Sequence, residues 1–252
     1  MEPACGREEF LICILARMMQ GVRTVAVGAS SPIPGAAALL AEAESGGRTT
    51  AMILGSTRHG PFNDGGPEVF DRAAQGRIDV FCMGGGQIDG AGNINLVGTG
   101  SYPRSDARFP GSFGTPYLYM LVPRVILFRE EHSRRVLVSS VDFVSAPGVS
   151  PETLHRPGGP HALVTGRAVF LFDRPAGRFV LQSLHPAESE AEVKASTGFD
   201  YAVSPALRAT PSPNGATLSL LRGVVRDRIA EIYPQFAATR LTGARIRPSR
   251  SG

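Results

Sequence analysis

The part of this sequence best suited to chemistry is a glycine run followed at once by small polar residues. The run is Gly84, Gly85 and Gly86, and it comes directly after the apolar segment 80–83. The polar residues that follow are Gln87, Asp89, Asn93 and Asn95. A glycine loop lets backbone N–H groups approach an anion or a carbonyl oxygen closely. The plainer interpretation is a tight turn that closes a buried sheet, but so many polar groups beside a core strand favour a polar cleft.

A second loop with reactive side chains follows the β-prone segment 49–54. It contains Ser56, His59, Asn63 and Asp64. His59 lies in a loop after a candidate sheet strand, where functional residues tend to sit. The five histidines lack the i, i+4 spacing of metal ligands on a helix, and no acidic cluster accompanies them, so we predict no metal site.

Alternating β-prone and helical segments must position both loops. Apolar spacing predicts helices over 8–20, 36–43, 68–75, 188–196 and 216–232, and strands over 22–27, 49–54, 80–83, 124–128 and 136–144. Residues 158–184 predict a β-hairpin region with a turn at 175–177. The order strand, loop, helix at the start is the opening of a βαβ unit, so we predict an α/β fold.

Length and composition limit the class of protein. With 252 residues, 42% hydrophobic and 19% charged, we predict one globular domain over 1–242 and a loose C-terminal tail over 243–252. The net charge is +4, but the arginines are scattered, which argues against nucleic-acid binding. Three unpaired cysteines favour the cytoplasm, and no apolar run is long enough to cross a membrane.

Several common nucleotide and hydrolase motifs fail in this sequence. A phosphate-binding P-loop needs a lysine after glycine, but the single lysine, Lys194, follows Val193. The dinucleotide fingerprint fails because Asp89 stands where its third glycine belongs. No serine lies in a GxSxG elbow, which argues against an ordinary α/β-hydrolase.

Four ordered segments resemble the β subunits of family I coenzyme A transferases, glutaconate coenzyme A transferase in particular. The segments are 84–95 (GGGQIDGAGNIN), 108–114 (RFPGSFG), 141–148 (VDFVSAPG) and 197–200 (TGFD). The resemblance implies a coenzyme A transferase-like open, mostly parallel sheet flanked by helices, to which the hairpin region is added. It also implies an α subunit of related fold, an α2β2 assembly and a coenzyme A thioester as substrate. The residues it places at the thioester are Gly84, Gly85, Gly86, Asp89, Asn93, Gly111 and Ser112, with Gln87, Ser56 and His59 as catalytic candidates.

One departure from the family pattern concerns its nucleophile. The transferases use a glutamate in an E-S-G or E-N-G turn after the second strand, but Leu54 stands at that place here. Glu44, Ser45 and Gly46 spell the motif about ten residues too early, at the end of a predicted helix, and we interpret them as a chance match. An apolar side chain cannot carry an acyl group. We therefore expect the nucleophile, where the reaction needs one, to come from another chain.

Three functions stay open on this evidence. The first is the β subunit of a coenzyme A transferase-like heteromer. The second is the β subunit of an acyl-coenzyme A ring-opening hydrolase of steroid catabolism, which the loss of glutamate and the segment 183–186 (SLHP) resemble. The third is a non-catalytic partner subunit, against which the retained Gln87, Asp89 and Asn93 argue. The acyl group and the partner chain do not follow from the sequence.

Overall fold

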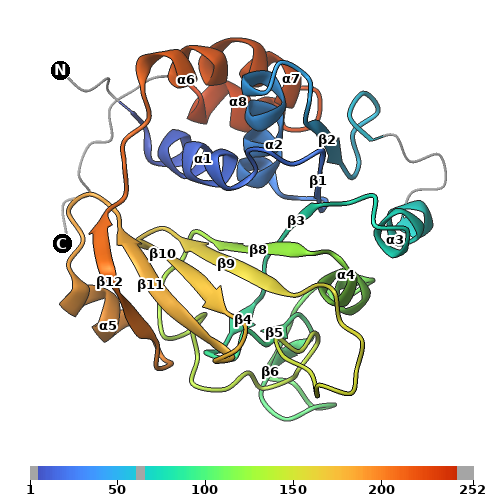
Figure 1. The fold of residues 1–252 in the computed structure, drawn as a ribbon, viewed down its shortest axis with the longest axis vertical. Coiled ribbons are helices and arrows are strands. Elements are labelled where there is room, and N and C mark those ends of the chain that lie inside the picture. The colour runs from blue at the N-terminus through green and yellow to red at the C-terminus, as the bar shows by residue number, and fades with distance from the viewer. Residues whose placement is uncertain (1–4, 61–65, 243–252) are drawn as a thin grey trace. The chain divides into compact units, whose positions relative to one another are not determined.

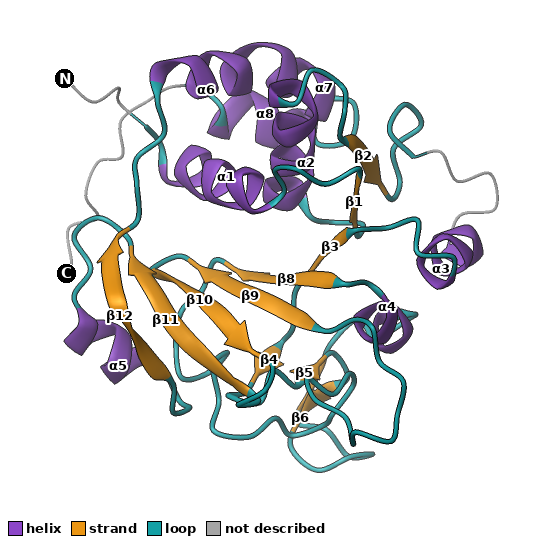
Figure 2. Cartoon of the chain, in the orientation of Figure 1, coloured by secondary structure: helices purple, strands orange, loops and turns teal. Residues whose placement is uncertain are grey.

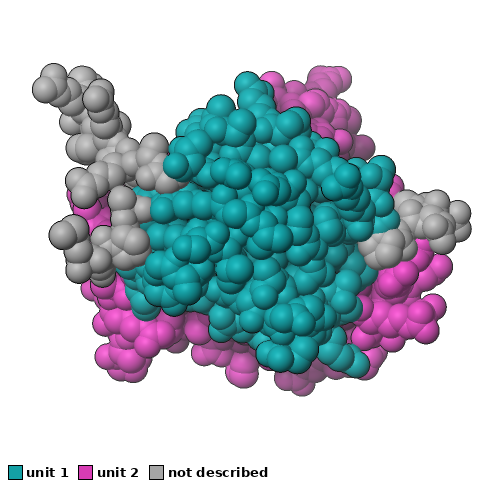
Figure 3. All heavy atoms as spheres, turned by 90° about the horizontal axis from the view of Figure 1, so that it is seen from above, with its two compact units in different colours: residues 1–65, 211–252 teal, residues 66–210 magenta. Residues whose placement is uncertain are grey.

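The computed structural model describes residues 5–60 and 66–242. The chain divides into two compact units, one of residues 1–65 and 211–252 and the other of residues 66–210 (Figure 3). Each is described separately below. The one-domain interpretation stays a prediction, and the expected tail at 243–252 lies outside the described residues, as do Asn63 and Asp64.

The first unit combines two parallel strands with helices from both ends of the chain (Figure 1). Its elements are α1 (Arg7–Met18), β1 (Thr24–Val27), α2 (Pro32–Glu44), β2 (Thr50–Ile53), α6 (Gly215–Leu220), the π-helical segment η1 (Leu221–Val225), α7 (Arg226–Ile229) and α8 (Pro234–Arg240). β1 and β2 pair in parallel from Thr24↔Thr50 to Val27↔Ile53. The apolar residues of α2 are buried. Nonhelical dihedrals at Gly223 divide the predicted 216–232 helix into segments.

The second unit is built on six neighbouring strands in the order β12-β11-β10-β9-β8-β3 (Figure 2). They are β3 (Val80–Met83), β8 (Arg124–Arg129), β9 (Pro160–Thr165), β10 (Ala168–Asp173), β11 (Arg178–Leu184) and β12 (Ala202–Ala209), with helices α3 (Gly66–Ala74), α4 (Thr115–Leu121) and α5 (Glu190–Ser196). β3, β8 and β9 run parallel, as do β11 and β12, whereas β10 is antiparallel to both its neighbours. The predicted α/β class, mostly parallel sheet and hairpin region are confirmed.

Two short ladders lie beside this sheet in the chain segment that follows β3. They are β4 (Gln87–Ile88) with β5 (Ile94–Asn95), and β6 (Gly98–Thr99) with β7 (Ala107–Arg108). The core strand β3 is buried at every position. Within the described residues, no helix is both long and apolar enough to cross a membrane.

The sequence prediction was wrong at one strand and missed another. Residues 136–144 form no strand, because they meet the β4–β5 hairpin only through an isolated bridge, Ile88↔Leu137. The missed strand is β12, whose Pro205 disguised it. Proline is tolerated there because β12 ends the strand order and its register with β11 shifts after Leu181.

Candidate functional site

The turn that follows β2 carries no nucleophile. Ser56 N donates to Ile53 O (3.1 Å), and Gly55 has φ +90°, so residues 53–56 form a β-turn in which the third position favours glycine. Leu54 occupies the second position and is half-buried. Glu44 ends α2, as predicted, and its carboxylate accepts a hydrogen bond from Thr217 Oγ1 (2.7 Å). The glutamate expected of a transferase is therefore missing from this turn.

A distant carboxylate, that of Glu231, holds the turn instead. Ser56 Oγ donates to Glu231 Oε2 (2.6 Å), and Thr57 donates through its N (2.8 Å) and its Oγ1 (2.7 Å) to Glu231 Oε1. Burial acts to raise the pKa of Glu231, but the hydrogen bonds from Ser56 and Thr57 outweigh it and bring that pKa to about 2. Glu231 is therefore a fixed anion with occupied lone pairs.

Ser56 and His59 are the two catalytic candidates in this loop, and both are committed to local contacts. Ser56 Oγ also accepts from the backbone N–H groups of Arg58 (3.2 Å) and His59 (2.7 Å). The His59 ring lies against the guanidinium of Arg228, with 3.2 Å between His59 Nδ1 and Arg228 Nη2, and Arg228 pairs with Glu42. Partial burial and then the charge of Arg228 lower the pKa of His59. The imidazole is thus kept neutral.

The glycine run after β3 is shaped by close packing in the second unit. A Cβ on Gly85 would lie 2.3 Å from Ile94 Cγ2, and one on Gly86 would lie 2.2 Å from the Phe109 ring. Gly86 N donates to Asn95 O (2.8 Å). Among the residues that the structure describes, the N–H groups of Gly84 and Gly85 find no acceptor. The glycines therefore have a structural role, and two of their N–H donors remain for a ligand.

Gln87 belongs to a buried polar network at the base of the β4–β5 hairpin. Its Nε2 donates to Asp142 Oδ2 (3.1 Å), and its Oε1 accepts from Asn95 Nδ2 (2.7 Å) and Asp142 N (3.0 Å). Asp142 Oδ2 also accepts from Gly100 N (2.9 Å). Since its oxygen accepts two hydrogen bonds and its nitrogen donates one, Gln87 joins three irregular segments that no regular sheet holds together.

Asp89 and Asn93 lie at the other end of the hairpin, across its tip. Asp89 Oδ1 accepts from Ala91 N (3.1 Å) and Asn93 N (3.0 Å), and Asp89 Oδ2 accepts from Asn93 Nδ2 (3.0 Å). Asn93 Oδ1 accepts from Gly148 N (3.0 Å). These contacts build the loop. The length of the hairpin separates Asp89 and Asn93 from the glycine run, so the structure does not bring all the expected thioester contacts together.

Asp89 also borders an open hollow of about 760 Å³. The hollow is lined by Asp89, Gly90, Ala91, Arg134, Ser139, Ala191, Lys194, Ala195, Thr197, Gly198, Phe199 and Asp200. Lys194 Nζ pairs with Asp200 (3.1 Å), and Arg134 Nε donates to Ala195 O (2.8 Å), so its cations are already engaged. The sequence-predicted cleft thus has its counterpart at the hairpin tip, lined by charges that largely satisfy one another.

The loop with Gly111 and Ser112 packs near the hairpin base. Gly111 has φ +106° and donates its N–H to Leu96 O (3.0 Å), while Ser112 O accepts from Thr115 N (2.9 Å) at the start of α4. Phe109 from the same loop contacts Gly86. Gly86, Gln87, Gly111 and Ser112 therefore come from one neighbourhood of the second unit.

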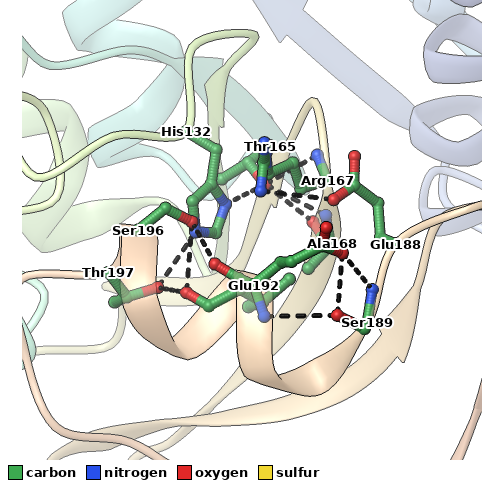
Figure 4. Close-up of polar contacts among 10 residues, drawn as sticks. His132, Thr165, Arg167, Ala168, Glu188, Ser189, Glu192, Ser196 and Thr197 are labelled. Carbon is green, nitrogen blue, oxygen red and sulfur yellow. Dashed lines mark hydrogen bonds and ion pairs between the residues drawn. The ribbon is translucent and has the colours of Figure 1, made fainter.

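A buried histidine far from these loops in sequence has a structural role (Figure 4). His132 Nδ1 lies 2.8 Å from Thr165 Oγ1, and its Nε2 lies 2.9 Å from Thr197 Oγ1. Thr197 Oγ1 donates to Val193 O (2.7 Å), which leaves its oxygen to accept from the ring. Burial and then the charge of Arg167 lower the pKa of His132 to about 4. The neutral ring joins β9 to the end of α5.

Sequence reasoning missed Glu231 and the contact partner of Gln87. Glu231 follows a helix and no local motif marks it, whereas Asp142 lies within the 141–148 segment and that segment was a usable signal. No group of three or more histidine, cysteine, aspartate or glutamate side chains suited to a metal occurs within residues 5–60 and 66–242.

Comparison with known proteins gives consistent similarities. Residues 5–196 match the family model described as Coenzyme A transferase. The chain is 33% identical over 150 residues to the β chain of glutaconate CoA-transferase from Acidaminococcus fermentans, a match that covers 57% of this chain and 55% of that relative. It therefore spans just over half the length of that transferase chain.

Two further similarities cover more of the chain. Over 205 residues it is 30% identical to the cholesterol ring-cleaving hydrolase IpdB subunit of Mycobacterium tuberculosis, covering 77% of this chain and 78% of that relative. The solved structure of the decarboxylase AibA/AibB has a TM-score of 0.74 at 27% identity and covers 94% of this chain and 99% of the other. The three relatives differ in the reaction that they are named for.

Proposed function

Since this chain belongs to the coenzyme A transferase family, we propose that it is the β subunit of a heteromeric enzyme acting on an acyl-coenzyme A thioester, with the covalent nucleophile outside this chain. The partner is an α subunit of related fold, in an α2β2 assembly. Relatives named as one of two kinds of subunit support a heteromer. The proposal is for a half-site: this chain positions the thioester, and its partner supplies the attacking group.

The observation that carries this proposal is the turn after β2. Leu54 is apolar, and the carboxylate that reaches this turn, Glu231, accepts three hydrogen bonds from Ser56 and Thr57. A carboxylate with a pKa of about 2 and occupied lone pairs is a weak nucleophile and a weak base. Glu231 therefore acts as the support of the loop, and the chain has no acyl carrier here.

The free N–H groups of Gly84 and Gly85 support a role toward the thioester carbonyl. Negative charge develops on that oxygen when the carbonyl carbon is attacked, and fixed backbone donors stabilise it without reorganisation. Gly86, Gln87, Gly111 and Ser112 would hold the loop that aims these donors. Asp89 and Asn93 would contribute by fixing the hairpin, and Ser56 and His59 by fixing the loop after β2.

The experiment is to co-express this chain with the related chain encoded beside it and to assay the complex with acyl-coenzyme A thioesters. Borohydride reduction followed by mass spectrometry locates any glutamyl thioester. We expect activity only for the complex, and any adduct on the partner. An adduct on a glutamate of this chain, with Glu44 as the first to check, would contradict the proposal.

A hydrolase that opens a ring in an acyl-coenzyme A is the second candidate function. Two observations favour it: the missing glutamate, and the long match with a ring-cleaving hydrolase. The two reactions differ in the acceptor of the acyl group, so the complex should be supplied with a free carboxylic acid in ¹⁸O-labelled water. Label in the released acid indicates hydrolysis, whereas a new thioester indicates transfer. A complex whose partner alone retains full activity would indicate that this chain is a non-catalytic partner.

A further inference from the structure

We infer that Arg129, together with the N–H groups of Gly84 and Gly85, forms a binding site for a carboxylate at the edge of the sheet where β3 and β8 end. The identity of the ligand rests on the proposed function: the carboxylate would be a second acidic group on the acyl chain or the free acid. The site itself rests on contacts within the second unit.

The strand pairing brings Arg129 to the glycine run. β3 and β8 are parallel neighbours in the register Val80↔Arg124 to Met83↔Leu127, so both chain segments leave the sheet at one edge. A Cβ on Gly84 would lie 3.1 Å from Phe128 O and 3.9 Å from Arg129 Cδ. The aliphatic part of the Arg129 side chain therefore runs beside Gly84. A larger residue at position 84 would crowd it.

The guanidinium of Arg129 is unusually short of partners. Its Nε is buried and has no hydrogen-bond partner. Its Nη2 lies 4.0 Å from Glu131 Oε2, too far for a hydrogen bond. Glu131 itself is shared, since it accepts from Ser133 Oγ (2.5 Å) and pairs with Arg135. Buried donors without acceptors are destabilising and rare, and a bound ligand is one explanation for them.

The donors that meet here suit a carboxylate. A guanidinium presents N–H groups in a planar fork that matches the two oxygens of a carboxylate, and backbone N–H groups bind the same oxygens. The phosphates of coenzyme A are a less suitable match, because the long pantetheine arm separates them from the thioester that the glycine run would hold. An acidic group on the acyl side is close enough to reach both Arg129 and the glycine loop.

The first test needs only this chain. In ¹⁵N-labelled protein, the amide signals of Gly84 and Gly85 and the Nε–H signal of Arg129 are followed during titration with glutarate, with the neutral diamide glutaramide, and with inorganic phosphate. We expect saturable shifts at all three signals with glutarate, none with glutaramide, and weaker shifts with phosphate. The Arg129→Met variant should lose the glycine shifts, while Arg135→Met, which removes an exposed cation of the same cluster, should keep them.

Three results of that titration would overturn the inference. They are the absence of saturable shifts with glutarate, glycine shifts that persist in Arg129→Met, and phosphate binding tighter than glutarate binding. The last would assign the site to a phosphate in place of a carboxylate.

The second test uses the heteromer. We expect Arg129→Met to lower the preference of kcat/KM for glutaryl-coenzyme A over pentanoyl-coenzyme A by about 10- to 100-fold, the usual effect of one charge-assisted contact. Arg135→Met should leave that preference unchanged. An equal loss for both thioesters would contradict a carboxylate site. A heteromer inactive on every thioester would contradict the proposed function, while the titration would still decide the role of Arg129.

Discussion

Removal of the Glu231 carboxylate should loosen the loop after β2. Glu231→Ala deletes the acceptor of three hydrogen bonds, two from Thr57 and one from Ser56. Hydrogen bonds to a charged group contribute about 1.5–3 kcal/mol each when buried, but Glu231 is partly exposed and solvent screens it. We therefore expect a loss of about 2 kcal/mol in unfolding free energy at pH 7, and about half of that for Glu231→Gln.

The effect should depend on pH in a defined direction. The folded pKa of Glu231, about 2, is below the usual glutamate value of about 4.3. Its stabilising contribution is therefore fully present above the unfolded pKa and is lost as pH falls through the folded pKa. The difference between wild type and Glu231→Ala should shrink steadily from about pH 5 down to about pH 2.

Two measurements test this reasoning. Hydrogen exchange of the Thr57 and His59 amides, which donate to Glu231 and to Ser56, should accelerate in Glu231→Ala more than exchange in the second unit. Denaturant unfolding at pH 7 and near pH 3 gives the free-energy difference. Glu152→Ala, which removes an exposed glutamate, is the control. Unchanged loop exchange in Glu231→Ala, or a stability difference that stays constant with pH, would refute the argument.

Three further predictions concern other buried groups. Leu54→Glu should give little or no borohydride-trapped adduct by mass spectrometry when the chain is mixed with acyl-coenzyme A, because an error of about 1 Å in placement disables a nucleophile; efficient trapping would contradict this. Arg222→Met should lower the unfolding free energy by about 3 kcal/mol in denaturant melts, because Glu9, fully buried and 2.7 Å from Arg222 Nη2, loses a charge partner, and Glu9→Gln in the same background should restore part of it. His132 has a pKa of about 4, below the unfolded value of about 6.5, so its stabilising contribution is present above pH 6.5 and is lost as pH falls toward 4. His132→Gln should flatten that part of the stability profile by about 2 kcal/mol, and an unchanged profile would contradict it.

Local patterns in the sequence were sufficient for most of the elements. Helical spacing predicted α1, and the apolar run 80–83 predicted β3 with the bounds observed. The same reasoning failed for residues 136–144, whose alternation suits a strand but whose backbone meets the β4–β5 hairpin in a single bridge. Strand propensity describes a chain segment, whereas strand formation requires a neighbouring strand in register.

The sequence by itself determined the α/β class, the glycine loop at the end of β3 and the absence of a glutamate at position 54, because each depends on residues adjacent in the chain. Only the tertiary structure decided which polar groups face one another. Glu231 reaches Ser56 across 175 positions, and Asp142 reaches Gln87 across 55. Arg129 meets Gly84 through the register of two parallel strands. Hydrogen-bond partners of this kind depend on where the fold places distant segments, and no local spacing encodes that.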